Sequence, residues 1–337
     1  STMSLFPSLV ASWFLMLIKL QACHCCGMIQ HNEIAFRAQQ LLSSPKHWGG
    51  KPPTWLPHLL HQQRASLHAG APAPDFGYVC FDHDAGEWMH WTPFHVTAVR
   101  HLHAKYGQDP EAWSPAGQRL AAFLAGAVSH MIADTNWHGL GDTVRGGWRV
   151  PPGRGFLKEQ GGADFGCDGS LCQVTHSTGD TGGEFVIAAH TELKWLDLDW
   201  HVPLDDLLSI FRAGNYTVAA VDVMECAALF LAASNVFALA AAQADLPFQH
   251  TAPLMRSSLQ THYFGGVDDS VEWTLRRWQQ VAGWMEGSSP LPPVTAAQVL
   301  QGRVNTLDTH QALLRQWRLA GLHRLVHINQ SGSSARL

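Results

Sequence analysis

The chain has 337 residues, of which 46% are hydrophobic and 15% charged, and its formal net charge is -5. This length suits one large domain or two small ones, and a chain without a basic excess is not expected to bind nucleic acid non-specifically. Histidine is unusually frequent, with 21 residues against 22 lysines and arginines together. Because the neutral imidazole is the commonest metal ligand, the positions of these histidines carry most of the functional information.

Residues 1–25 predict a secretory signal peptide. Residues 5–20 are mostly apolar with Lys19 as their only charge, and small residues and cysteines follow. An uncleaved membrane anchor is the alternative interpretation. The glycosylation sequons at Asn215 and Asn329 agree with secretion. We therefore expect a secreted glycoprotein that is extracellular after removal of its signal peptide.

The cysteines number seven, which leaves at least one without an intramolecular partner. Three of them crowd residues 23–26, and four are scattered along the chain. Cys167 and Cys172 are close enough in sequence to close a small disulfide loop in an oxidising compartment, although the geometry could forbid it. The disulfide pairing therefore stays open.

The spacing of apolar residues predicts an all-α fold, since no alternating strand pattern and no internal repeat stand out. Residues 45–89 and 139–172 are rich in Gly, Pro or both and are interpreted mostly as loops. A Pro-rich run at 290–293 marks a boundary between one domain over 26–290 and a partly disordered tail over 291–337. Helices are predicted at 32–43, 93–105, 116–138, 174–195, 203–212, 217–243 and 267–286, with weaker patterns at 55–69 and 306–327.

The helix predicted at 217–243 is apolar enough to be considered as a transmembrane span. Its uncharged stretch, 226–242, is only 17 residues long and includes Ser234 and Asn235. That length is marginal for crossing a bilayer, so a buried core helix is the favoured interpretation.

The helix predicted at 116–138 carries the clearest chemical pattern. His130, Asp134 and His138 follow one another at a spacing of four, which places them on one face of the helix. Apolar residues such as Phe123 and Ala127 share that face, so it should point inward. Burying these groups is costly unless they bind a metal or form a hydrogen-bonded network, and both alternatives remain open here.

A second pair, His176 and Asp180, also has a spacing of four and lies near the predicted start of a helix. Both side chains could reach one ion. The alternative is a helix N-terminus capped by Ser177 or Thr178. The helix dipole would then stabilise the negative charge of Asp180 in the first turn.

Three further candidates are His31, which opens the first helix, Asp75 in a loop, and His90 at a helix entrance. Each could be an ordinary polar residue. A single catalytic zinc uses three protein ligands, so candidates from five segments suit two or three ions. Clustered metals are suited to phosphodiester cleavage, because they can activate water and neutralise phosphate charge. Nitrogen-rich ligation favours zinc.

Five motifs follow one another along residues 26–286: Cys26–Ala38, His90–Phe94, Ser129–Gly141, Thr175–Gly183 and Tyr263–Asp269. Together they resemble the catalytic domain of the glycosylphosphatidylinositol-specific phospholipase D family. Their histidine and aspartate pattern is more distantly similar to bacterial zinc phospholipases C and fungal single-strand nucleases, which share an all-helical site for three zinc ions.

The resemblance implies three zinc ions and a role for each candidate residue. Asp75 would also be the general base. Cys26 departs from the tryptophan common in related enzymes, and its amine is free only after cleavage before it. One ion would be held by Asp75, His90, His130 and Asp134, a second by His138, His176 and Asp180, and a third by His31, Asp134 and the backbone amine and carbonyl of Cys26.

The implied activity is hydrolysis of the inositol-phosphate linkage of glycosylphosphatidylinositol anchors, which releases phosphatidic acid and the anchored protein. The expected partners are such anchored proteins and phospholipid at a membrane surface, without nucleic acid. The alternatives are a related zinc phospholipase C, a single-strand nuclease, or a catalytically silent zinc-binding domain. The D-type outcome rests on resemblance, because the sequence does not show the orientation of the substrate. The family's β-propeller has no counterpart after residue 290, which leaves the activity of this short chain open.

Overall fold

A computed structural model describes residues 27–44, 53–138, 156, 170–196, 199–244, 253–261 and 265–293, with the backbone alone at 170–178, 181, 244, 253 and 254. Within these ranges every regular element is a helix and no strand occurs, so the predicted all-α fold is confirmed. Four predictions lie outside the described residues and stay predictions: the signal peptide, a disulfide at Cys167, the weaker helix pattern at 306–327 and the expected disorder at the end of the tail.

All seven of the more strongly predicted helices are present. The helix predicted at 174–195 begins at Ser170, four residues earlier than its pattern indicated. The elements in chain order are α2 (Met28–Leu41), α3 (Trp55–Gln62), α4 (Arg64–Gly70), η2 (Ala73–Asp75), α5 (Phe76–Cys80), α6 (His83–Met89), α7 (Thr92–Tyr106), η3 (Pro110–Ala112), α8 (Pro115–His138), α10 (Ser170–His190), α11 (Leu204–Ala213), α12 (Ala220–Ala244), α14 (Pro253–Ser258) and α15 (Val267–Met285).

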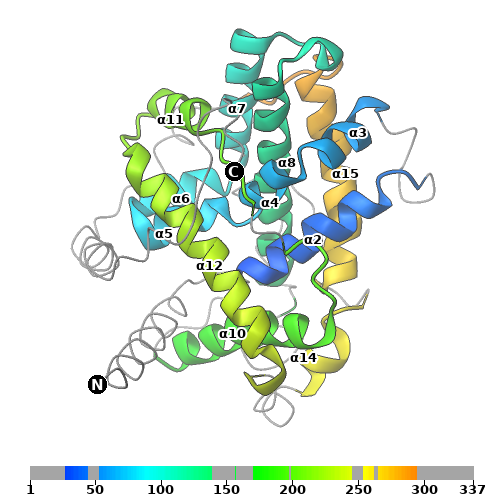
Figure 1. Ribbon diagram of the computed structural model, residues 1–337, viewed down its shortest axis with the longest axis vertical. Helices are drawn as coiled ribbons and strands as arrows, with labels where there is room; N and C mark the ends of the chain where they lie inside the picture. The colour runs from blue at the N-terminus through cyan, green and yellow to red at the C-terminus, as the bar shows by residue number, and fades with distance from the viewer. Residues whose placement is uncertain are drawn as a thin grey trace, which may run out of the picture.

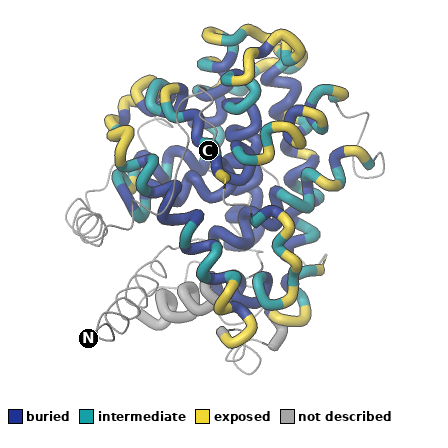
Figure 2. The backbone as a smooth tube through the Cα atoms, viewed as in Figure 1, coloured by how far each residue is buried: buried dark blue, intermediate teal, exposed yellow. Residues whose placement is uncertain are grey.

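Helix α8 forms the centre of the structure (Figure 1). It is buried along most of its length and packs against α2, α4, α7 and α15, which leaves the exposed backbone at the periphery (Figure 2). Its approach to α4 depends on small residues, because a Cβ on Gly126 would lie 2.3 Å from the carbonyl oxygen of Leu67. A Cβ on Gly70 would likewise lie 2.1 Å from the carbonyl oxygen of Phe123. Glycine at both positions therefore lets the two backbones touch.

The interpretation of residues 71–89 as loop is wrong. The segment folds into the short helices η2, α5 and α6, which are too brief to show a hydrophobic period. Helix α6 begins because the Asp82 side chain accepts hydrogen bonds from the backbone N–H groups of Asp84 at 2.9 Å and Ala85 at 3.1 Å. Packing of α5 and α6 on each other and on η2 supplies the remaining stability that local sequence does not reveal.

Helix α12 is the one helix among the described residues that is long and apolar enough to cross a membrane by length and composition. More than half of its most apolar window is buried inside the protein. Phe230, Leu231 and Phe237 pack into the core, while Leu239 is exposed. This burial agrees with the favoured interpretation of a core helix, since the core helix of a globular domain passes the same test.

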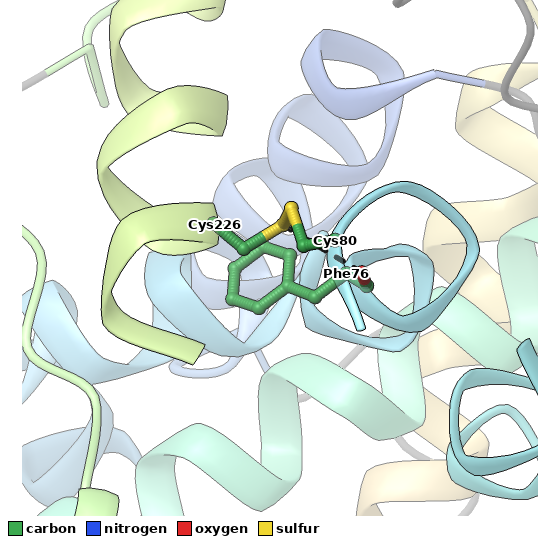
Figure 3. The surroundings of a disulfide bond; sticks show 3 residues. All are labelled: Phe76, Cys80 and Cys226. Atoms are coloured by element: carbon green, nitrogen blue, oxygen red, sulfur yellow. Dashed lines mark hydrogen bonds between the residues drawn. A yellow bond between two sulfur atoms is a disulfide. The ribbon is translucent and has the colours of Figure 1, made fainter. Parts of the chain in front are cut away.

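A disulfide between Cys80 and Cys226 joins α5 to α12 across 146 residues (Figure 3). The sequence analysis did not predict this pair, because no spacing relates two cysteines so far apart. Phe76 lies beside the disulfide and packs edge-on against Phe230, with the ring centroids 4.9 Å apart. Helix α5 is thereby fixed to the core directly after Asp75, the residue that ends η2.

Candidate metal centre

Five of the predicted ligands come together at the C-terminal part of α8. His31 comes from the first turn of α2, Asp75 from η2, His90 from the end of α6, and His130 and Asp134 from α8. All five are buried, and none is more than 4% exposed. The structure contains two overlapping groups of three residues, each with ligand atoms within 4.8 Å of one another: His31, His130 and Asp134, and Asp75, His90 and His130.

The two carboxylates lie between three imidazoles. Asp134 is nearest to His130, with 3.2 Å between Oδ2 and Nε2, and the stacked rings of His31 and His130 have centroids 3.6 Å apart. The remaining Nε2–oxygen distances are 3.3 Å for His90–Asp75, 3.4 Å for His90–Asp134, 3.5 Å for His31–Asp134, 3.6 Å for His130–Asp75 and 3.8 Å for His31–Asp75.

Backbone carbonyl groups set the orientation of two of these imidazoles. His130 Nδ1 lies 2.7 Å from the carbonyl oxygen of Ala71, and His90 Nδ1 lies 2.8 Å from that of Gly86. A carbonyl oxygen only accepts, so each Nδ1 carries the proton and donates it. In the neutral ring, Nε2 then presents a lone pair, which is the form in which histidine binds metal.

The Nε2 atoms of His90 and His130 face the carboxylate oxygens of Asp75 and Asp134. Within the described part of the chain, neither oxygen of Asp75, nor Oδ1 of Asp134, nor Nε2 of His90 or His130 has a hydrogen-bond partner. Buried acceptors that face one another at 3.2–3.6 Å repel unless protons or a cation lie between them. The nitrogen and oxygen donors fit a zinc ion, which is bound by imidazole and carboxylate.

The charges of the site agree with a preformed ligand cluster. Burial raises the pKa values of Asp75 and Asp134, but the neighbouring histidines, above all His130, outweigh it and hold both values below their usual range. Burial and the adjacent His130 lower the pKa of His31 to about 3, so this imidazole is neutral at neutral pH. Burial opposes charge on His90 as well, yet Asp75 and Asp134 raise its pKa to about 9. Metal binding at neutral pH must therefore displace a proton from His90.

The second predicted ligand set is described only in part. His138 Nε2 lies 3.8 Å from Asp134 Oδ1, and Asp180 is buried on α10. Burial, above all, raises the pKa of Asp180 well above its usual range. His176 lies within α10, but its side chain is outside the described residues, as is the whole of Cys26.

The capping alternative for residues 177 and 178 is wrong. Helix α10 begins at Ser170, so His176 and Asp180 lie inside the helix, one turn apart. The pattern placed the helix start too late because the Ser, Thr and Gly between the two residues are typical of a helix terminus.

Several partners of these groups were not predicted. Trp137 Nε1 donates to Asp180 Oδ1 at 2.7 Å and thereby links α8 to α10. Trp137 lies beside His138 in sequence, but no spacing rule marks it. The roles of the Ala71 and Gly86 carbonyl groups could not be predicted either, because every residue has a backbone acceptor and the sequence does not mark which one is used. Whether any of these residues binds metal stays a prediction.

Comparison with known proteins agrees with this donor set. A model of the zinc-dependent phospholipase C family matches residues 31–213, which include every predicted ligand except Cys26. No solved structure matches the chain.

Phosphatidylinositol-glycan-specific phospholipases D are similar to this chain. The relative from Dictyostelium discoideum is 31% identical over 264 residues, 78% of this chain and 26% of that protein. The Bos taurus relative is 30% identical over 256 residues, 74% of this chain and 28% of that protein. The Homo sapiens relative is 29% identical over 271 residues, 78% of this chain and 30% of that protein. The chain thus spans less than a third of the length of these relatives. Since the family model covers more than half of the chain and its described candidate ligands converge, the chain belongs to the zinc-dependent phospholipase C family.

Proposed function

We propose that this chain is a zinc-dependent phosphodiester hydrolase that cleaves the inositol-phosphate linkage of glycosylphosphatidylinositol anchors. The observation that carries the proposal is the cluster of buried nitrogen and oxygen atoms of Asp75, His90, His130 and Asp134, which face one another at 3.2–3.6 Å and lack hydrogen-bond partners among the described residues. The substrate class comes from the relatives, which are phosphatidylinositol-glycan-specific phospholipases D.

The proposed centre holds three zinc ions. The first ligand set is Asp75, His90, His130 and Asp134, the second is His138, His176 and Asp180, and the third is His31, Asp134 and the backbone of Cys26. When bound, zinc supplies a Lewis acid for the phosphoryl oxygens and lowers the pKa of water.

Asp75 is the proposed general base. Its side chain is buried, and the surrounding histidines keep it ionised. A carboxylate with a lowered pKa holds a proton weakly, so its task would be to orient the attacking water and accept the proton as phosphorus is attacked. The buried cluster would keep bulk water from competing with the substrate.

Secretion is part of the proposal. The disulfide between Cys80 and Cys226 supports it, because disulfides form and persist mainly in oxidising compartments. Asn215, in one of the two sequons, is exposed and therefore accessible to glycosylation. Transient contact with a membrane surface follows from the lipid substrate.

The test uses the whole chain, produced through a secretory route, with three substrates. These are a glycosylphosphatidylinositol-anchored reporter in vesicles, phosphatidylcholine vesicles, and single-stranded DNA. Release of the reporter together with phosphatidic acid supports the proposal. Diacylglycerol as the lipid product would assign a phospholipase C outcome instead, and cleavage of DNA alone would assign a nuclease.

A matched pair of histidine variants controls this test. His130→Ala removes a proposed ligand, whereas His101→Ala removes a histidine that hydrogen-bonds to Asp206 at 2.8 Å outside the centre. Turnover should be lost in the first variant and kept in the second. A chain that binds zinc but turns over none of the three substrates would contradict the enzymatic proposal and leave the silent zinc-binding domain.

A further inference from the structure

A buried carboxylate outside the predicted ligand sets lies against the first turn of α2. Glu184 is on α10, one helical turn beyond Asp180, and is 4% exposed. It accepts hydrogen bonds from the backbone N–H of Ile29, at 2.8 Å to Oε1 and 3.1 Å to Oε2, and from that of Gln30 at 3.3 Å. These N–H groups belong to the first turn of a helix, where no intrahelical acceptor is available. Glu184 therefore serves as the cap of α2 from 154–155 residues away.

Gly27 makes this approach possible. It is the N-cap residue of α2 and offers no side-chain hydrogen bond to the helix. Its φ of +89° is a conformation that L side chains rarely adopt, and a Cβ at this position would lie 1.9 Å from Glu184 Oε1. The close contact of the carboxylate with α2 therefore requires glycine at residue 27.

The contact costs free energy that an apolar pair would not. Burial raises the pKa of Glu184 to about 8, against the opposing effect of the Ile29 and Gln30 N–H groups. What a carboxylate adds is direction, because hydrogen bonds to successive N–H groups fix both the height and the rotation of the helix.

His31 is the residue that this orientation controls. Its backbone N–H donates to the carbonyl oxygen of Gly27 at 3.1 Å, which closes the first turn of α2. Its Nε2 lies 3.5 Å from Asp134 Oδ1 in the candidate centre. A rotation or shift of the first turn would carry the imidazole away from the shared carboxylate.

We propose that Glu184 is a positioning residue for the metal centre, and that it holds the first turn of α2 where His31 can share an ion with Asp134. The inference rests on the proposed function, in which the centre binds zinc. Because Asp180 and Glu184 are one turn apart, the same turn of α10 would serve two ions, one through a direct ligand and one through α2.

The experiment compares Glu184→Ala and Glu184→Gln in the full chain with His31→Ala as a reference for the loss of a ligand. Glu192→Gln is the matched control, because its side chain is largely exposed just beyond α10. Zinc per chain is measured after dialysis against increasing concentrations of chelator. Visible absorption of the cobalt-substituted proteins then shows which coordination site has changed.

Glu184→Ala should lose one ion at a chelator concentration about 10- to 100-fold lower than the unaltered chain, as is typical when a residue supporting a ligand is removed. Its cobalt spectrum should resemble that of His31→Ala, with the other ions retained. Glu184→Gln keeps one oxygen acceptor, so the chelator concentration at which it loses the ion should lie between those of Glu184→Ala and the unaltered chain. Glu192→Gln should match the unaltered chain.

A purely structural role gives a different pattern. The urea midpoint of the metal-free variants would fall, while zinc retention stayed unchanged, and that result would overturn the positioning role. If Glu184→Ala does not fold, Glu184→Gln and Gly27→Ala carry the test, and full zinc retention in both would also overturn it. An unaltered chain without zinc would contradict the proposed function itself, and the positioning role with it.

Discussion

Two regions of the molecule bury an aspartate beside histidine, and the two aspartates have different hydrogen-bond partners. On the α7–α11 side, Asp206 accepts hydrogen bonds from His101 at 2.8 Å, Lys105 at 2.6 Å and Tyr106 at 2.9 Å. In the candidate metal centre, the oxygens of Asp75 have no hydrogen-bond partner and face the imidazoles of His90 and His130 at 3.3 and 3.6 Å.

We call Asp206 and its donors His101, Lys105 and Tyr106 the clamp. Its comparison with the metal centre shows how a structural hydrogen-bonded group differs from a cluster of metal ligands. Around Asp206 each oxygen meets a donor, so the group is complete without a cation. Around Asp75 and Asp134 the Nδ1 groups of His90 and His130 donate to backbone carbonyl oxygens, so that only the Nε2 atoms face the carboxylates. The same residue types therefore carry opposite functional meanings, which depend on which nitrogen is already bonded.

The largest effect is expected from Asp134→Asn, which alters the carboxylate shared by His31, His90 and His130. Zinc content should fall, and hydrolysis should drop by roughly 1,000-fold or more, because losing several kcal/mol of transition-state stabilisation has that effect. Metal analysis and the vesicle assay measure both. Asp206→Asn should keep its zinc and its turnover, and an equal loss in both variants would erase the distinction between the two regions.

Removal of the metal should destabilise the protein through the centre alone. At free zinc about 1,000 times the dissociation constant, binding stabilises the folded state by about 4 kcal/mol, which corresponds to a Tm change of about 6 °C for a chain of this size. Thermal melting with zinc and with chelator gives the difference. The increment should be the same in Asp206→Ala, since the clamp does not contact the ions; a smaller increment would mean that the two regions are coupled.

Asp206→Ala should cost stability without changing the metal. The substitution leaves His101, Lys105 and Tyr106 without a shared acceptor, and a loss of about 1–3 kcal/mol is expected for these partly buried donors. Lys105 is half-exposed and can regain water, which favours the lower part of that range. Urea unfolding measures the loss, with Asp205→Ala on the exposed face of α11 as the matched control.

The smallest expected effect is a pH dependence of the clamp. Burial raises the pKa of Asp206, but Lys105, His101 and Tyr106 outweigh it and lower the value below its usual range. A lowered carboxyl pKa contributes stability that is present above the unfolded value of about 4 and is lost as the pH falls through the folded value. The difference in stability between the unaltered chain and Asp206→Asn, measured in chelator, should therefore shrink below about pH 4. A difference that grew there would have the wrong sign.

Features of the fold and the site that depend on neighbouring residues could be predicted from the sequence, whereas contacts between distant segments could not. The period of Leu120, Phe123 and Ala127 predicted α8, and the spacing of His130 and Asp134 placed two ligands on its buried face. His31, Asp75 and His90 were candidates from distant segments, and the resemblance assigned each of them to an ion. Their convergence became visible only in the structure, because no local rule relates α2, η2 and α6 to α8.

The sequence by itself determined the helical class, the presence of the long helices and the identity of the candidate ligands, since those depend on periodicity and on residue chemistry. Tertiary structure alone decided the Cys80–Cys226 disulfide, the short helices after residue 71 and the cap that Glu184 provides to α2. It also decided which nitrogen of His130 faces the centre, because the carbonyl of Ala71 reaches Nδ1 only where α4 and α8 touch at glycine. Contacts between segments far apart in the chain leave no periodic pattern in the sequence. These contacts are what distinguish the candidate metal centre from the clamp at Asp206.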